Sequence, residues 1–201
     1  KYIVNEFDVY RSLRKVSLNK SSGPDTIPNK VLKELAVFLA EPICAIINSS
    51  VRQGATPAEW KISRVTPLPK CYPPKTIEND VRPISITNTI AKIAEKFVGQ
   101  WFTDFFETHL DPNQFGATAR RSTTHALIKL THQIFKASEN SNNFIRIIFV
   151  DFTKAFDLID HNVLLQKFID YDFPPHLTIW SLTFLLDRQQ FVKIGNLQSA
   201  L

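Results

Sequence analysis

The chain has 201 residues, of which 44% are hydrophobic and 21% are charged, so it can bury a core in one or two domains and is not a disordered tail. A formal net charge of +5 fits a polyanionic partner, although many basic proteins bind no nucleic acid. Two cysteines, Cys44 and Cys71, are too few for a disulfide framework or a zinc site with four ligands.

The N-terminal part of the chain predicts a series of helices. Residues 1–16 mix apolar and basic positions and predict a short helix. A Gly-Pro-Asp turn at residues 23–25 precedes Pro28, which can occupy the first turn of a helix that runs through Phe38. Pro42 predicts the start of a second helix, and Gly54 predicts its end.

A basic hairpin is predicted next. Residues 60–70 alternate basic and apolar side chains like a half-exposed strand, and residues 80–85 form a second such strand after a proline-rich loop. Together they predict a hairpin with one cationic face. The alternative is an ordinary solvated sheet surface, because Lys and Arg are common on such surfaces.

Two capped helices follow the hairpin. Asn88 is the predicted cap of a long helix that reaches Phe106, and we interpret its aromatic stripe as core rather than as a base-stacking platform. After a turn at residues 110–116, Ser122 is the predicted cap of another helix. The Arg-Arg-Ser-Thr sequence at its start is of the kind that can cradle a phosphate.

Residues 144–150 form an apolar, β-branched run that predicts a buried strand ending at Asp151. A carboxylate at that position can bind a divalent cation, which prefers oxygen ligands. The alternative is a core strand whose terminal Asp caps the following turn. Asp160 and His161, both interpreted as structural, then open a predicted helix, and a helix at residues 175–187 and a strand at residues 190–195 complete the chain.

The string Phe-Val-Asp-Phe-Thr-Lys-Ala-Phe-Asp at residues 149–157 closely resembles the first catalytic motif of reverse transcriptases from non-LTR (LINE-like, Jockey/CR1-type) retrotransposons. The resemblance extends from about residue 17 to residue 198, in the motif order of that family. It implies an α+β, right-hand polymerase fold in which helical fingers with a basic β-hairpin precede the start of an antiparallel palm sheet, with an incomplete palm and no thumb. We expect the N-terminal extension and fingers in residues 1–140 and the first part of the palm in residues 141–201.

The resemblance also assigns roles to individual residues. In the family, the first Asp of the motif binds the catalytic metal ions, and the aromatic residue five positions later lies under the incoming sugar. Asp151 is therefore the predicted catalytic and metal-binding residue, and Phe156 is the predicted steric gate. The predicted nucleotide-binding residues are Lys70, Arg82, Phe152 and Phe156, and the predicted template-binding residues are Ser22, Gly23, Arg121 and Ser122.

Two points of the resemblance stay open. The role given to Lys70 falls equally well on Lys61 or Arg64, because all three are cations of the same predicted hairpin strand. The template motif around Arg121 departs from the family at Ala117 and Thr118, where an aromatic and a basic residue are usual. This departure places one template contact in question.

The implied function is that of an enzyme, an RNA-directed DNA polymerase that uses Mg²⁺, or Mn²⁺, to copy an RNA template onto a DNA primer from deoxynucleoside triphosphates. The Gly-x-Pro-Gln-Gly and aromatic-x-Asp-Asp motifs do not occur in these residues, so we expect the chain to be inactive without the remainder of the polymerase chain. The alternative is a non-catalytic RNA-binding remnant, or a domesticated retroelement protein, that no longer depends on Asp151. An RNA-virus polymerase is a further alternative, against which Phe156 argues.

The expected location is intracellular. No apolar run reaches the length of a membrane span and no signal peptide opens the sequence, so neither secretion nor a membrane partner is expected. The family's use of chromosomal DNA as a primer implies the nucleus and the cytoplasm. Because the chain contains no methionine, we expect it to be a piece of a longer reading frame.

Overall fold

The computed structural model describes residues 2–139, 144–152, 155 and 158–201. The chain forms two compact units. The larger unit comprises Lys1–Phe102 and Asp160–Leu201, and the smaller unit comprises Thr103–Ile159. The expected boundary between fingers and palm at residue 140 falls inside the smaller unit and stays a prediction. No helix among the described residues is long and apolar enough to cross a membrane.

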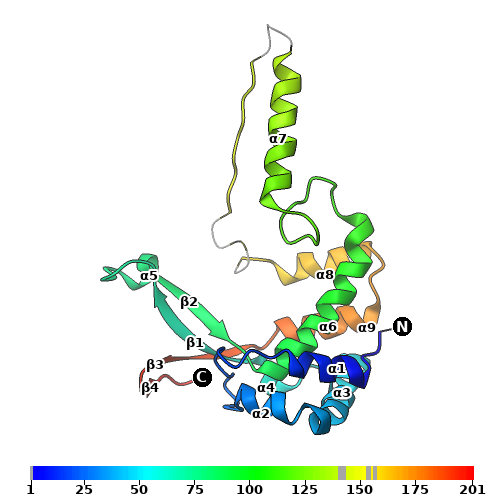
Figure 1. Cartoon of the computed structure of the whole chain (residues 1–201), viewed down its shortest axis with the longest axis vertical. Helices are drawn as coiled ribbons and strands as arrows, with labels where there is room; N and C mark the ends of the chain where they lie inside the picture. Colours follow the sequence, from blue (N-terminus) through cyan, green and yellow to red (C-terminus); the bar gives the residue numbers. More distant parts are fainter. Residues whose placement is uncertain (1, 140–143, 153–154, 156–157) are drawn as a thin grey trace. The chain divides into compact units, whose positions relative to one another are not determined.

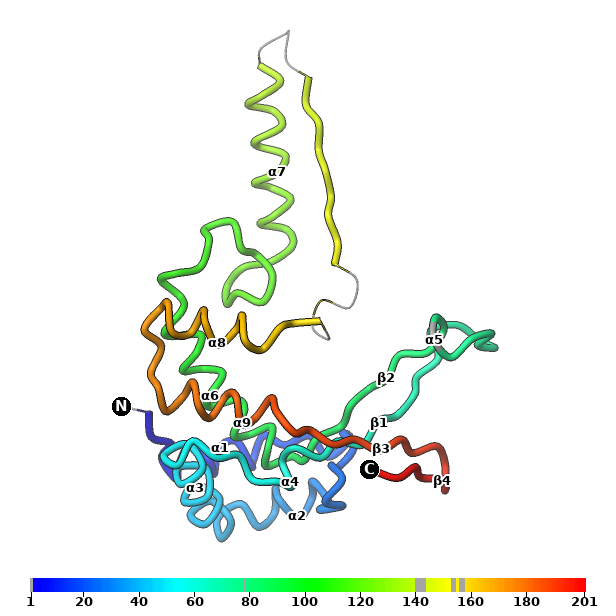
Figure 2. The backbone as a smooth tube through the Cα atoms, turned by 180° about the vertical axis from the view of Figure 1, so that it is seen from behind, coloured from blue at the N-terminus to red at the C-terminus, as the bar shows by residue number. Residues whose placement is uncertain are grey.

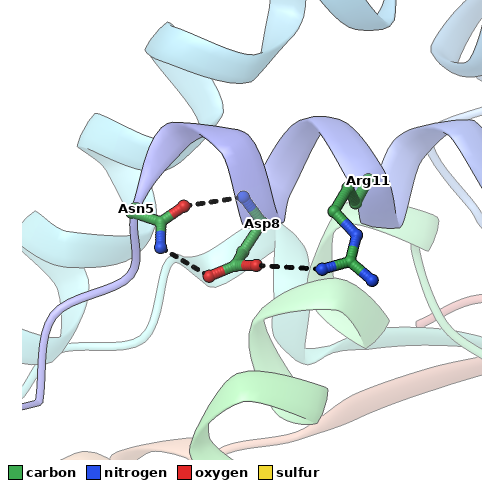
Figure 3. A network of polar contacts seen from close by, with 3 residues as sticks. All are labelled: Asn5, Asp8 and Arg11. Atoms are coloured by element: carbon green, nitrogen blue, oxygen red, sulfur yellow. Dashed lines mark hydrogen bonds and ion pairs between the residues drawn. The ribbon is translucent and has the colours of Figure 1, made fainter.

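Helix α1 (Glu6–Arg14) begins with a network of polar contacts (Figure 3). Asn5 accepts a hydrogen bond from the Asp8 N–H at 2.8 Å and donates one to the Asp8 carboxylate at 2.6 Å. The second carboxylate oxygen of Asp8 lies 3.9 Å from the Arg11 guanidinium. Because the first N–H groups of a helix lack partners within the helix, the Asn5 side chain stabilises this end. The predicted short helix is confirmed.

Helices α2 (Asn29–Glu34) and α3 (Ala36–Gln53) follow each other with only Leu35 between them. The prediction that Pro42 starts a helix is wrong, because Pro42 lies inside α3. The chain is already helical when it reaches Pro42, since the Leu39 N–H donates to the Leu35 carbonyl at 3.0 Å. Pro42 therefore removes one hydrogen bond from α3 without ending it. Gly54 has a φ of 62° and ends α3 as predicted.

The core of the larger unit lies where α3 contacts α1 and α9 (Pro175–Leu185). Leu13, Ile47 and Leu177 are among its fully buried side chains. Trp180 of α9 is also buried, and its Nε1 donates to the Ser50 hydroxyl of α3 at 2.9 Å. This hydrogen bond ties the C-terminal part of the chain to its N-terminal helices.

Part of the apolar face of α6 (Thr89–Phe106), which carries the predicted aromatic stripe, packs inward in the larger unit. Ile93, Ala94 and Val98 are buried. The Phe102 ring lies 5.3 Å from the ring of Phe168 in α8 (His161–Asp170). The interpretation of this stripe as core is confirmed for these residues. Asp160 accepts hydrogen bonds from the first N–H groups of α8, so its structural role is confirmed too.

A four-stranded sheet carries the predicted hairpin (Figure 1). The short helix α4 (Ala58–Lys61) leads into β1 (Ile62–Pro69), which pairs antiparallel with β2 (Val81–Ile86), and α5 (Ile77–Asp80) lies at the tip. Strand β3 (Gln189–Ile194) pairs in parallel with the other edge of β1 and antiparallel with β4 (Leu197–Gln198). The hairpin and the C-terminal strand are confirmed. The parallel pairing of β3 with β1 was not predicted.

The smaller unit contains a short 3-10 helix (Glu107–His109), α7 (Thr123–Ser138) and the segment of residues 144–152, which is extended in Figure 2. The prediction of a buried strand at residues 144–150 is wrong, because these residues are exposed and pair with no strand in the described part of the chain. Phe149 is 83% exposed and Val150 is 75% exposed. A β-branched sequence favours extended backbone, but a strand also needs a hydrogen-bonded neighbour. The expected antiparallel palm sheet is therefore not seen among the described residues.

Candidate functional site

One face of the sheet carries the predicted cations. Arg64 lies opposite Ile86, and Leu68 lies opposite Arg82. Side chains alternate between the two faces of a strand, so Arg64 and Arg82 share one face. The other face of β1 carries Ser63 and Val65, which are buried. The hairpin with one cationic face is thereby confirmed.

Two lysines extend this face. Lys70 follows β1, and its backbone N–H donates to the Asp80 carbonyl at 2.6 Å, so the antiparallel pairing and its alternation continue to Lys70. On the other side of β1, Phe191 of β3 is paired with Arg64, which places the exposed Lys193 on the same face. We call Arg64, Lys70, Arg82 and Lys193 the cationic face. Lys193 was missed in the sequence because its place depends on the unpredicted pairing of β3.

Lys70 is held by the tip of its own hairpin. Its ammonium donates to the Asn79 carbonyl at 2.6 Å. Next to it, the Asp80 carboxylate accepts hydrogen bonds at 2.9 Å from the N–H groups of Thr76 and Lys75. These two hydrogen bonds, with a smaller contribution from the Lys70 charge, hold the pKa of Asp80 below its usual value. Lys70 therefore has a structural contact in addition to its predicted nucleotide role.

Arg82 is exposed, and no hydrogen bond or ion pair with any described residue holds its guanidinium. A guanidinium is planar and can bond two phosphate oxygens at once. Among the predicted nucleotide-binding residues in the larger unit, Arg82 is thus the one placed to bind an anionic ligand without breaking a contact.

Arg64 connects the cationic face to residues 21–25, which we call the Gly-Pro-Asp loop. Its Nη2 donates to the Ser21 hydroxyl at 2.6 Å and to the Ser22 carbonyl at 3.1 Å. The structure thus brings Ser22 to the same face as Arg82. It also gives Arg64 a structural contact, as Lys70 has, whereas Arg82 has none among the described residues. Gly23 is buried rather than open to a ligand.

Asn88 is a residue whose role the sequence did not reveal. It occupies the predicted cap position of α6, since its carbonyl accepts from the Lys92 N–H at 3.1 Å. Its side chain, however, accepts from the Asp25 N–H at 3.1 Å and donates to the Glu59 carbonyl at 2.9 Å. These partners are far away in the sequence, so no local pattern predicts them. The side chain of Asn88 therefore hydrogen-bonds the Gly-Pro-Asp loop instead of capping α6.

Asp151 and Phe152 lie in the smaller unit, at the end of the extended segment, and both are exposed. Phe156, the predicted steric gate, lies outside the described residues, as does Asp157. The described residues contain no group of three or more His, Cys, Asp or Glu side chains that could hold a metal ion. A divalent cation of the Mg²⁺ type needs several oxygen ligands, so Asp151 by itself does not fit a complete metal centre.

Arg121 and Ser122 precede α7, also in the smaller unit. Arg121 donates to the carbonyls of Pro112 and Gln114 at 2.6 and 2.9 Å, which closes the turn before the helix. Ser122 accepts from the His125 N–H at 3.4 Å, so the predicted cap is confirmed. The template roles of Arg121 and Ser122 stay predictions, as do the roles of the other site residues.

A comparison with known protein families decides which family this is. The model of the family described as "Reverse transcriptase (RNA-dependent DNA polymerase)" matches residues 73–199, more than half of the chain. The chain belongs to this family. The part matched to the reverse transcriptase family includes Arg82, Lys193 and Asp151, whereas the Gly-Pro-Asp loop precedes it. Reverse transcriptases generally use divalent metal ions, and they act on a nucleic-acid template and nucleotides.

Relatives among the transposon reverse transcriptases match between 72% and 96% of the chain. The chain is 27% identical over 192 residues to the "Probable RNA-directed DNA polymerase from transposon BS" of Drosophila melanogaster, covering 94% of this chain and 21% of the relative. It is 26% identical over 196 residues to the "RNA-directed DNA polymerase from mobile element jockey" of the same organism, covering 96% and 21%. It is 30% identical over 147 residues to the corresponding protein of the X-element, covering 72% and 16%.

The chain thus spans about a fifth of the length of the BS and jockey proteins. The predicted membership in the reverse transcriptases of non-LTR retrotransposons is confirmed. The described part of this reverse transcriptase domain is a mixed α/β structure with a small four-stranded sheet.

Proposed function

We propose that the chain is part of an RNA-directed DNA polymerase from a non-LTR retrotransposon, which copies RNA into DNA. In this proposal the hairpin and the helices before it belong to the fingers and their N-terminal extension, and Asp151 belongs to the palm. The observation that carries the proposal is that the Gly-Pro-Asp loop and the open guanidinium of Arg82 lie on one face of the sheet. Membership in the reverse transcriptase family supports it.

The ligands of the proposed polymerase are an RNA template, a DNA primer and deoxynucleoside triphosphates. All of them carry phosphates, which suit Arg82 and the lysines of the cationic face. Mg²⁺, or Mn²⁺ in its place, is the proposed cofactor. Asp151 would give the metal one carboxylate ligand, and its other ligands lie outside the described residues. We place the protein in the nucleus and the cytoplasm, where a chromosomal primer and an RNA template are found.

RNA binding by the 201-residue chain is expected to depend on the cationic face. Arg82→Ala should weaken binding of a primed RNA template in low salt. It should also make the slope of log affinity against log salt concentration shallower by about one, as expected for the loss of one phosphate contact. The measurement is the dissociation constant over a range of salt concentrations. The matched control is Arg52→Ala, because Arg52 is an exposed arginine on α3, outside the sheet. Equal losses in the two variants would show that only net charge matters.

A hybrid polymerase tests the activity itself. In the hybrid, this chain replaces the segment of the jockey protein that it matches, and the substrates are a primed RNA template and deoxynucleoside triphosphates with Mg²⁺. We expect primer extension that falls to background in Asp151→Ala, because that change removes a metal ligand. The 201-residue chain alone should extend no primer above its own Asp151→Ala control.

Two outcomes of this assay would count against these expectations. A hybrid that binds the primed RNA but extends no primer contradicts the proposed polymerase activity and favours an RNA-binding remnant. Extension by the unmodified 201-residue chain, but not by its Asp151→Ala variant, contradicts the expected inactivity of the chain alone.

A further inference from the structure

The Gly-Pro-Asp loop lies directly against the backbone at the start of α6. A Cβ added to Gly23 would lie only 2.4 Å from the Cα of Asn88 and 2.4 Å from its Oδ1. Such distances leave no room for any side chain at position 23. The loop backbone and the backbone of Asn88 are therefore in direct contact.

The Asn88 side chain joins three parts of the larger unit. Its Oδ1 accepts from the Asp25 N–H in the loop at 3.1 Å, and its Nδ2 donates to the Glu59 carbonyl in α4 at 2.9 Å. Helix α4 leads directly into β1, and β2 ends at Ile86, two residues before Asn88. One buried side chain thus connects the loop to the beginning of β1 and the end of β2.

A second contact holds the chain just before the loop. The buried hydroxyl of Thr89 donates to the Asn29 Oδ1 at 2.8 Å. The Asn29 amide in turn donates to the carbonyls of Ser17 and Lys20 at 3.1 and 2.8 Å. The loop is therefore tied to Asn88 at Asp25, and Lys20, the residue before the loop, is tied through Asn29 to Thr89, the first residue of α6.

We infer that Asn88 is a positioning residue, which holds the Gly-Pro-Asp loop and the hairpin at one fixed spacing so that a single RNA strand can contact both. The inference rests on the proposed function and on the predicted template-binding role of Ser22 in the loop. Asn88 is buried behind Gly23 and acts through the loop rather than by touching RNA. Its effect is to keep Ser22, which is half-buried, on the face that carries Arg82.

The test compares two asparagines that bond the backbone in the same way. Asn48 of α3 accepts from the Val4 N–H at 2.8 Å and donates to the Val4 carbonyl at 2.9 Å, away from the loop. Asn48→Ala therefore removes the same kind of contacts as Asn88→Ala. The measurements on the 201-residue chain are the dissociation constant for a primed RNA template and amide hydrogen exchange of residues 21–27 with and without that RNA.

In the wild-type chain, RNA should slow the exchange of the loop amides. Asn88→Ala should speed their exchange and lower RNA affinity about tenfold, the equivalent of one or two lost hydrogen bonds. Asn48→Ala should leave loop exchange and RNA affinity within about twofold of wild type.

The results separate the inference from the function on which it rests. If RNA binds but does not slow exchange of the wild-type loop, the template contact of the loop is wrong and the inference falls with it. If RNA does protect the wild-type loop, yet Asn88→Ala binds RNA as tightly as Asn48→Ala, the inference alone is overturned.

Discussion

Trp180→Ala is expected to lower the free energy of unfolding by about 3–5 kcal/mol, the usual cost of truncating a buried tryptophan. Trp180 is 3% exposed, and its ring stacks on Phe184 with the centroids 5.2 Å apart. The substitution leaves a cavity between α9 and α3 and removes the hydrogen bond from the indole to Ser50. The measurement is denaturant-induced unfolding of the 201-residue chain, followed by far-ultraviolet circular dichroism.

Trp101→Ala is the control for this prediction. Trp101 is only half-buried, and its ring contacts Tyr2 with the centroids 5.6 Å apart. Its truncation should cost about 1 kcal/mol, near the centre of the range for single substitutions. If the two variants lose the same stability, α9 is not anchored through Trp180.

Gly23→Ala is expected to destabilise the chain by about 1–3 kcal/mol, the range for forcing an extra methyl group into a packed site. The new methyl group would meet the Cα of Asn88, which belongs to the backbone at the start of α6 and cannot rotate away. The loop must therefore lift, which breaks the hydrogen bond from the Asp25 N–H to Asn88. Unfolding by denaturant measures the stability, and RNA affinity should fall together with it.

The control for Gly23→Ala is the same substitution in α6. A Cβ added to Gly99 would have nothing within 4 Å, and Gly99 lies in the interior of the helix. Because alanine is the better helix former, Gly99→Ala should stabilise the chain by up to about 1 kcal/mol. A Gly23→Ala variant with the stability and RNA affinity of the wild type would contradict the close packing of the loop on Asn88.

Local signals in the sequence predicted most of the helices and the hairpin. The cap at Ser122 and the left-handed end of α3 at Gly54 depend on a few neighbouring residues, so they could be identified from residue type alone. The cationic face followed from alternation along residues 60–70 and 80–85, which needs only strand geometry. Pro42 misled because proline usually lies in the first turn of a helix, whereas here it lies inside α3, and the helix continues through it.

Contacts between distant residues could not be predicted in the same way. Asparagine is a common helix-capping residue, so the sequence indicated only that role for Asn88. The hydrogen bonds of its side chain to Asp25 and Glu59, which are far away in the sequence, are seen only in the structure. Lys193 lies on the cationic face because its strand, β3, pairs with β1, which precedes β3 by more than a hundred residues in the sequence. Residues 144–150 have the propensity of a strand, but propensity does not supply the neighbour that a strand requires.

The parallel pairing of β1 with β3 also constrains the order in which the chain can fold during synthesis. The β1–β2 hairpin can form once Ile86 has left the ribosome. Strand β3, which pairs with the other edge of β1, begins only at Gln189. Until then, the backbone N–H and C=O groups along that edge are open to pairing with another chain. The nascent protein therefore carries an unprotected strand edge throughout the synthesis of about a hundred residues, a period in which a chaperone or bound RNA can act on it.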